Sequence, residues 1–274
     1  MKKITRITTQ KKRKDRYNIF LDDGAGEEYG FSVDTSILIE YQLRKGLELE
    51  NATVNELIQK DTMHKSYTLA IHYLSYRMRT KKEIHDYLVQ KEVEPDHIPV
   101  IINKLTNEKL IDDRQFAEMF IRTRINTSSK GPMVIRRELS DKGVAMSIID
   151  ESLHQYSYQA QFEKVQKLVD KKFQQKKKDS FRKQIQNLQA SLQQKGFTQD
   201  VVQAVLREVN ANQNQDEEWE AIIYQGEKLL RKHETKRTGY ELKNKVKEGL
   251  FRKGFAMDLI TRFIEEFIDG QEKA

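Results

Sequence analysis

The sequence contains no cysteine and only three prolines among its 274 residues. The missing cysteine excludes disulfides and thiol chemistry and is typical of proteins from a reducing cytosol. No apolar run approaches the roughly twenty residues that cross a membrane, and none follows the charged N terminus as in a signal peptide. Few prolines with abundant Leu, Lys, Glu and Gln predict a mainly helical chain. We therefore expect a cytoplasmic protein without a membrane partner.

Residue patterns typical of enzymes and metal sites are also absent from the sequence. It has no glycine-rich phosphate loop and no serine in a nucleophile elbow. The six histidines never form a helical pair with a third ligand nearby. Asp112 and Asp113 invite a catalytic or metal interpretation, but Asp112 stands three residues before Gln115, the spacing of a helix cap. We expect no enzymatic activity, no metal and no cofactor.

The charge balance is the first positive signal. Lys and Arg number 49 against 42 Asp and Glu, which gives a formal net charge of +7. Such an excess favours an anionic partner or surface. Both signs are interspersed along the chain, so much of this charge is ordinary solvated helix surface.

A six-residue pattern recurs along the chain and reads as the end of a helix. Three copies are Leu139–Val144, Leu192–Phe197 and Leu250–Phe255, and an earlier one, Leu88–Val93, has Glu92 in place of glycine. In each, a lysine occupies the last helical turn, where the helix dipole favours a cation, and glycine follows in the left-handed conformation that ends a helix.

The surroundings of these copies show that they belong to tandem repeats. Positions 7 and 3 before each lysine, and 2, 7 and 11 after it, are apolar in all four copies. The lysines are about fifty residues apart, which is enough for three helices per repeat. The apolar columns are, in order, Ile84, Ile135, Leu188 and Val246; Leu88, Leu139, Leu192 and Leu250; Val93, Val144, Phe197 and Phe255; Ile98, Ile149, Val202 and Ile260; and Ile102, Leu153, Leu206 and Ile264.

The N-terminal segment differs in kind from the repeats. Short β-rich runs at Ile4–Thr9, Tyr17–Leu21 and Tyr29–Val33 predict a small antiparallel sheet. Helices are predicted over Ser36–Arg44 and Thr53–Gln59, and we expect this part to pack on the first repeat, because its own core is small. The expected domains are residues 1–64, 65–109, 110–156, 157–212 and 213–274.

The junction between the first and second helices is cationic in every repeat. For a single residue, a solvated helix end is the simpler interpretation, because cations favour helix C-termini. The recurrence of the clusters favours a shared surface for an anion such as nucleic acid. Aromatic interleaving for base stacking is thin, and no helix has a clear base-reading pattern. The candidates are Arg77, Arg79, Lys81 and Lys82; Arg122, Arg124 and Lys130; Lys171, Lys172, Lys176, Lys177 and Lys178; and Arg231, Lys232, Lys236 and Arg237.

One series of motifs resembles the RecX family of recombination regulators. It comprises Tyr76–Ile84 leading to Leu88, Leu110–Ala117, Lys130–Pro132 and Arg136–Val144. The β-rich N-terminal segment resembles the extra region of longer members from low-GC Gram-positive bacteria. Glu92 departs from the family pattern, which often has glycine at that position.

The resemblance implies a non-enzymatic protein built as an elongated array of three-helix repeats, which resemble helix-turn-helix units. It implies binding along the groove of the RecA filament on single-stranded DNA, with inhibition or tuning of ATP hydrolysis and strand exchange. Contacts with double-stranded DNA and a monomeric state are also expected, and Arg136 and Arg137 join the candidate binding residues. Two alternatives are a stand-alone DNA-binding regulator, disfavoured because no dimerising heptads are visible, and an enzyme that uses Asp112 and Asp113.

Overall fold

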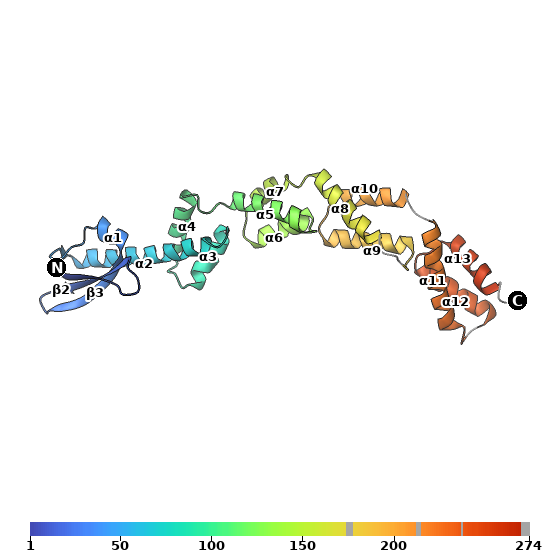
Figure 1. The fold of residues 1–274 in the computed structure, drawn as a ribbon, viewed down its shortest axis with the longest axis horizontal. Helices are drawn as coiled ribbons and strands as arrows, with labels where there is room; N and C mark the ends of the chain where they lie inside the picture. Colours follow the sequence, from blue (N-terminus) through green and yellow to red (C-terminus); the bar gives the residue numbers. More distant parts are fainter. Residues whose placement is uncertain (174–177, 212–214, 237, 270–274) are drawn as a thin grey trace. The chain divides into compact units, whose positions relative to one another are not determined.

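The chain is mainly helical, with a small sheet near the N terminus (Figure 1), which confirms the predicted fold class. The computed structural model describes residues 1–173, 178–211, 215–236 and 238–269. Contacts divide the chain into two units, Met1–Phe116 with Lys142–Val144, and Ala117–Asp141 with Ala145–Ala274.

The sheet has the antiparallel order β3-β2-β1-β4. Its strands are β1 (Lys2–Thr9), β2 (Arg16–Asp22), β3 (Glu27–Asp34) and the short β4 (Glu48–Leu49), which the sequence pattern did not indicate. Ile7 pairs with Ile19, and Ile19 pairs with Phe31. Alternating residues bury one face of the sheet, as the period of two dictates.

A helix, α2 (Asn51–Leu74), connects the sheet with the first three-helix repeat. The sequence predicted two separate helices here, but no glycine or proline interrupts the segment, and one 24-residue helix forms. The preceding α1 spans Thr35–Glu40. Buried Arg16 fastens the sheet to α2 through an ion pair with Asp61, with 2.6 Å between Nη2 and Oδ2. The expected packing of this segment on the first repeat therefore occurs through a shared helix.

Three-helix repeats follow α2. Their helices are α3 (Lys81–Gln90) and α4 (His97–Asn107); α5 (Asp113–Thr127), α6 (Pro132–Asp141) and α7 (Met146–Leu153); α8 (Tyr158–Phe173), α9 (Phe181–Gln194) and α10 (Gln199–Ala211); and α11 (Gln215–His233), α12 (Gly239–Arg252) and α13 (Met257–Ile264), which continues as a π-helical turn over Glu265–Asp269.

The apolar columns of the sequence form the cores of these repeats. All residues in the columns 7 and 3 before the lysine and 7 after it are buried, and those of the other two columns are buried or half-buried. This confirms the predicted repeat pattern. The second helix has 10 residues in α3 and α6 but 14 in α9 and α12. The last two repeats are therefore variants of one longer type.

Each Lys-Gly copy ends its helix as predicted. Gly143, Gly196 and Gly254 have φ of +79°, +84° and +90°. The next residue donates its N–H back into the helix, as from Phe197 to the Leu192 carbonyl at 3.3 Å. Glu92 adopts the same left-handed conformation, with φ of +58°. The departure at Glu92 therefore leaves the cap intact.

The same caps also form the contacts between consecutive repeats. The Thr80 hydroxyl, at the start of α3, donates to the carbonyl oxygen of Lys142 at 2.8 Å. The Ser180 hydroxyl, at the start of α9, donates to the carbonyl oxygen of Lys253. At the start of α6 the backbone takes this role, because the Gly131 N–H donates to the carbonyl oxygen of Lys195 at 2.7 Å. We call each of these contacts a joint.

Close approach at the joints explains why glycine follows the lysine. A Cβ on Gly196 would lie 2.6 Å from the backbone nitrogen of Val134, and one on Gly143 would lie 2.6 Å from the Lys82 Cβ. Gly131 is equally restricted, because its Cβ would lie 2.4 Å from the Gly196 carbonyl. Glu92 belongs to the first repeat, which no earlier three-helix repeat precedes. Its side chain is tolerated there for that reason.

The joint predicts a local effect of Gly196→Ala. The added Cβ should separate α6 from the cap, so the amides of Gly131 and Met133, which donate to Lys195 and Gly196, should lose hydrogen-exchange protection. A left-handed alanine costs about 1–2 kcal/mol, so we expect a loss of protection of about 5- to 30-fold.

Gly46→Ala is the matched control for this measurement. Gly46 has a similar φ of +91°, but no atom lies within 4 Å of an added Cβ. It should leave the amides of Gly131 and Met133 protected. Unchanged protection of these two amides in Gly196→Ala would show that the glycine serves the helix end alone.

Candidate nucleic-acid interface

A carboxylate completes the first and third joints. The Asp113 Oδ1 accepts the Lys81 N–H at 2.9 Å, and the Glu218 Oε2 accepts the Phe181 N–H at 2.7 Å. Each therefore satisfies an N–H at the first turn of the preceding repeat's second helix, where the dipole favours an anion. At the middle joint the first helical residue is Pro132, which has no N–H to satisfy.

The structure separates the roles of the two adjacent aspartates. The Asp112 Oδ1 accepts the N–H groups of Arg114 and Gln115 at 2.8 and 3.1 Å, which confirms the predicted helix cap. Asp113 instead faces the joint, a role that the capping pattern did not reveal. Among the described residues no group of three His, Asp or Glu side chains could hold a metal ion.

Burial raises the pKa of Asp113, an effect that the hydrogen bond from the Lys81 N–H opposes but does not cancel. Burial likewise raises the pKa of Glu218. The folded protein therefore takes up a proton at these groups more readily than the unfolded chain does. Their contribution to stability is largest in acid and falls as pH rises from the unfolded value through the folded pKa.

Asp113→Asn should flatten this pH dependence. Asparagine keeps an oxygen that accepts the Lys81 N–H but has no proton to lose. Relative to the parent chain, the variant should gain urea resistance as pH rises from about 4 to 7, and Glu218→Gln should behave alike. Urea midpoints across this range test the prediction. Parallel curves for parent and variants would contradict it.

Most candidate cations of the first repeat are engaged within the protein. Both Arg77 and Lys142 bind the Glu83 carboxylate, with N–O distances of 3.1 and 2.7 Å. The Arg79 guanidinium stacks on the Tyr73 ring, 3.9 Å from its centroid. Lys81 joins the contact with Asp113 through its backbone, and Lys82 packs against Gly143. These residues stabilise the first joint.

Most candidate cations of the second repeat are also paired. Arg124 and Lys130 share the Glu138 carboxylate, with 2.9 Å from the Arg124 Nε. Arg136 binds Asp150 at 2.6 Å. Arg122 and Arg137 are exposed and form no ion pair with the described residues. Only these two could receive an anion without breaking an existing pair.

The third repeat presents its cations differently. Lys171 and Lys172 are exposed, form no ion pair with the described residues, and line a groove of about 540 Å³ together with Lys195 and the Asn187 amide. Lys178 lies over the Tyr224 ring at 4.1 Å. Lys176 and Lys177 lie outside the described residues. The lining also includes three leucines and the Asp179 carboxylate. Ammonium groups at the edge of such a groove can hold phosphate oxygens.

In the fourth repeat, Arg231 forms an exposed pair with Glu227 at 3.1 Å. Lys232 and Lys236 are exposed and form no ion pair with the described residues, and Arg237 lies outside those residues. Exposed pairs such as that of Arg231 contribute little to stability and are readily exchanged for a stronger anion. Among the described candidate residues, the exposed cations without an ion pair or ring contact are thus Arg122 and Arg137 in the second repeat, Lys171 and Lys172 in the third, and Lys232 and Lys236 in the fourth.

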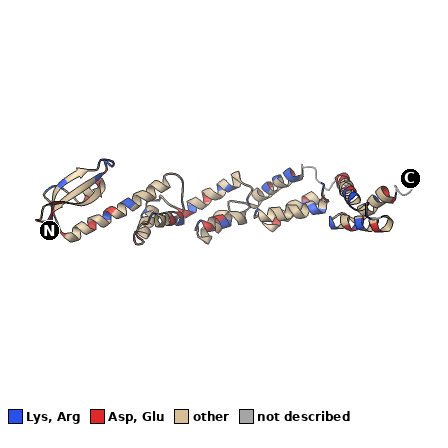
Figure 2. Cartoon of the chain, turned by 90° about the horizontal axis from the view of Figure 1, so that it is seen from below, with Lys and Arg blue, Asp and Glu red and all other residues tan. Residues whose placement is uncertain are grey.

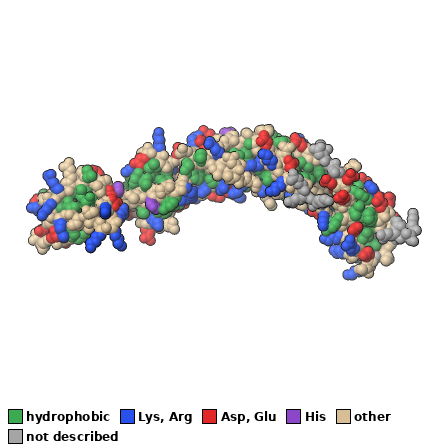
Figure 3. All heavy atoms as spheres, in the orientation of Figure 1, with side chains coloured by type: hydrophobic (Ala, Val, Ile, Leu, Met, Phe, Trp, Pro, Cys, Tyr) green, Lys and Arg blue, Asp and Glu red, His purple; other side chains and the backbone are tan. Residues whose placement is uncertain are grey.

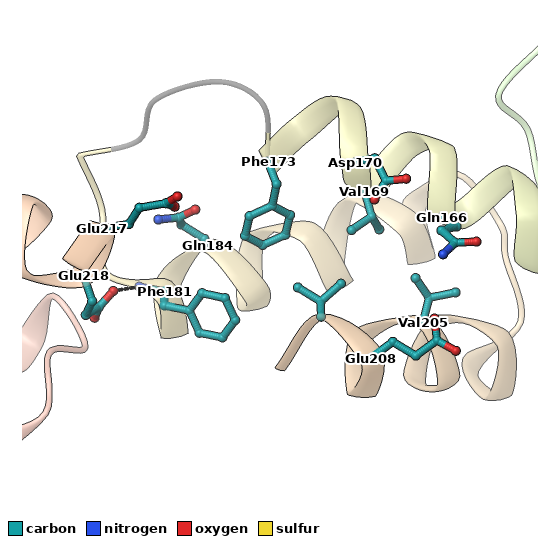
Figure 4. A pocket seen from close by; sticks show the side chains of 11 residues that line it. Gln166, Val169, Asp170, Phe173, Phe181, Gln184, Val205, Glu208, Glu217 and Glu218 are labelled. Atoms are coloured by element: carbon teal, nitrogen blue, oxygen red, sulfur yellow. Dashed lines mark hydrogen bonds between the residues drawn. The ribbon is translucent and has the colours of Figure 1, made fainter. Parts of the chain in front are cut away.

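A second cavity of the third repeat has the opposite charge (Figure 4). It measures about 320 Å³ and has an apolar lining that includes Val169, Phe173 and Phe181. Its charged lining groups are all carboxylates, from Asp170, Glu208, Glu217 and Glu218. Lys171 and Lys172 lie on another face of α8 than Val169, Asp170 and Phe173. Helix α8 therefore contributes both to a groove lined by two exposed lysines and to a cavity whose charged groups are carboxylates.

Lys171→Ala with Lys172→Ala should weaken binding to single-stranded DNA without lowering the melting temperature. Two lost phosphate contacts should reduce the salt slope of the affinity by about 1.4. Fluorescence anisotropy of a labelled oligonucleotide between 50 and 200 mM salt would measure it.

The comparison variant is Arg124→Ala with Lys130→Ala. It should lower the melting temperature, because Glu138 loses both partners, and should change the salt slope less. If the two double variants weaken DNA binding equally, the distinction between paired and available cations is wrong.

These features define a class: a repeat protein of tandem three-helix units with a small β-sheet domain at its N terminus. Family models match 2–50 ("Regulatory protein RecX N-terminal domain"), 67–105 and 112–153 (its first and second three-helix domains) and both 159–206 and 216–264 (its third). The chain belongs to the RecX family of regulatory proteins. The double match of the third domain agrees with the longer second helices of the last two repeats.

Relatives match nearly the whole chain. The regulatory protein RecX of Oceanobacillus iheyensis is 54% identical over 273 residues, 99% of this chain and 100% of the relative. That of Bacillus cytotoxicus is 41% identical over 262 residues, 96% of this chain and 97% of the relative.

Solved structures agree with the fold. A crystal structure of regulatory protein RecX is 37% identical, with a TM-score of 0.66, and covers 76% of this chain and 100% of its own. RecX from Lactobacillus salivarius is 38% identical, with a TM-score of 0.54, and covers 56% and 99%. No helix among the described residues is long and apolar enough to cross a membrane.

Proposed function

We propose that the protein is a non-enzymatic, cytoplasmic regulator of the RecA recombinase. It binds the RecA filament on single-stranded DNA along the filament groove and inhibits ATP hydrolysis and strand exchange. Membership of the RecX regulatory family supports this function.

The observation that carries the proposal is the threefold recurrence of one joint. Thr80, Gly131 and Ser180 each meet the lysine carbonyl of the next Lys-Gly cap, at the corresponding point of a second helix. A chain of units joined in one way repeats its surface, as a filament repeats its subunits. Several weak contacts to a repeating target then combine through effective concentration.

The cations available to an anion supply the contact with the nucleoprotein. Lys171, Lys172, Lys232 and Lys236 are exposed, and the first two line a groove. Their interaction with phosphates is electrostatic and independent of base sequence, which suits a filament assembled on any single strand. The array would bind as a monomer, because each repeat supplies its own contact.

Titration of the protein into RecA with single-stranded DNA and ATP tests this function. ATP hydrolysis should fall as the protein is added, and Lys171→Ala with Lys172→Ala should need a higher concentration for half of the effect. Gly46→Ala, which changes no joint residue and none of the candidate cations, is a suitable folded control. A titration by folded protein that leaves ATP hydrolysis unchanged would contradict the proposal.

A further inference from the structure

A basic loop joins β1 and β2, outside the three-helix repeats. Lys11, Lys12, Arg13 and Lys14 are consecutive and all exposed, and Figure 2 shows a blue stretch of backbone at one tip of the N-terminal sheet. Arg13 pairs with Asp15 at 3.1 Å. The three lysines form no ion pair with the described residues. The loop therefore holds three ammonium groups that are available to an anion.

The loop is held on a rigid base. At its ends, the Gln10 N–H donates to the Arg16 carbonyl at 2.9 Å, and the Thr35 N–H donates to the Asp15 carbonyl at 2.9 Å. Arg16 is itself buried in its ion pair with Asp61. The lysines thus project from an anchored hairpin, and ordering them on a ligand costs less entropy than ordering a free tail.

Beside the loop lies a groove that extends along α2. It measures about 380 Å³, and Arg13, His64, Lys65 and His72 are among its lining residues. The carboxylates nearby are engaged: Asp61 binds Arg16 and Lys65, at 2.6 and 2.9 Å.

Asp34, the remaining acid of the groove, caps α1 through the Ser36 N–H at 2.9 Å and lies 3.9 Å from His64. The loop and the groove together form one positively charged surface, which we call the hairpin surface.

The chemistry of the hairpin surface indicates phosphate as its ligand group. Residues 10–15 contain no aromatic side chain. Proteins that bind single-stranded DNA stack its bases on aromatic side chains, so this loop is poorly suited to a single strand. Three unpaired lysines within four residues match a backbone of closely spaced charges, and a duplex carries one charge per about 1.7 Å of its axis. We propose that the hairpin surface binds the phosphate backbone of double-stranded DNA.

This inference goes beyond the proposed function, because it assigns a separate site and is measured without the recombinase. In a RecA complex, the hairpin surface would hold a duplex while the repeats contact the filament. The Lys11→Ala, Lys12→Ala, Lys14→Ala variant of the full chain removes the three unpaired lysines and leaves the pair of Arg13 and Asp15 in place.

Anisotropy of a labelled random-sequence duplex at increasing salt is the test. Loss of three phosphate contacts should lower the salt slope by about 2.7 and the affinity at 0.1 M salt at least ~10-fold. The matched control is Lys167→Ala, Lys228→Ala, Lys247→Ala, which removes the same charge from exposed helix positions elsewhere. It should change the affinity about twofold or less.

The remaining outcomes are equally decisive. An equal loss in both triple variants would mean that net charge alone drives binding and would overturn the inference. So would a loss confined to single-stranded DNA, or to vesicles of an anionic lipid, with duplex binding unchanged. The loop variant should still inhibit RecA ATP hydrolysis. A failure of that inhibition in the parent chain would count against the proposed function and not against the hairpin surface.

Discussion

The hydrogen bond to the lysine carbonyl of each Lys-Gly cap is the interaction on which the repeats depend. A helix C-terminus leaves carbonyl groups without intrahelical partners, and a helix N-terminus leaves N–H groups without them. At each joint, a carbonyl group at the C-terminal end of one helix accepts a hydrogen bond from a group at the start of another helix. The Thr80 hydroxyl accepts the Glu83 N–H of its own helix at 3.1 Å and donates to the Lys142 carbonyl at 2.8 Å. One side chain thereby satisfies two helix ends in neighbouring repeats.

Because one contact serves two helix ends, the choice of residue is restricted on both sides of the joint. The cap needs glycine, because a side chain would separate the backbones, and the N-terminal side needs a small residue that still provides a donor. Threonine and serine provide a hydroxyl, whereas Gly131 provides its backbone N–H and is small enough to bring the Lys195 carbonyl to 2.7 Å. Pro132 then removes the one N–H that Asp113 and Glu218 satisfy at the other joints. The three joints thus have the same geometry although different residues form them.

The helices, the repeat and the caps were predictable because they depend on local patterns. The columns that begin at Ile84 and Leu88 follow the helical period, and the caps are six-residue motifs. The joints were not predictable, since Thr80 and Lys142 are far apart in sequence and nothing local marks them as partners. The continuous α2 was missed because a weakly patterned segment without glycine or proline gives no boundary to read. The pairing of Arg77 and Arg124 was missed for a similar reason, because charge counts do not reveal which carboxylate folds beside them.

The capping motifs of α3 and α9 differ at one position, and this difference affects the partners of the cations in the first and third repeats. Glu83 occupies the third position of α3, where it completes the capping box with Thr80 and also binds Arg77. Three residues after Ser180, the corresponding position of α9 is Lys183, whose N–H the serine accepts at 3.3 Å. The third repeat thus keeps the hydroxyl half of the cap and replaces its carboxylate with a cation. In the first repeat Arg77 pairs with Glu83 beside the joint, whereas in the third Lys171 and Lys172 are exposed and line a groove. The exchange of Glu83 for Lys183 thus removes one internal partner for a cation, which accords with the proposed binding of an anion by the third repeat.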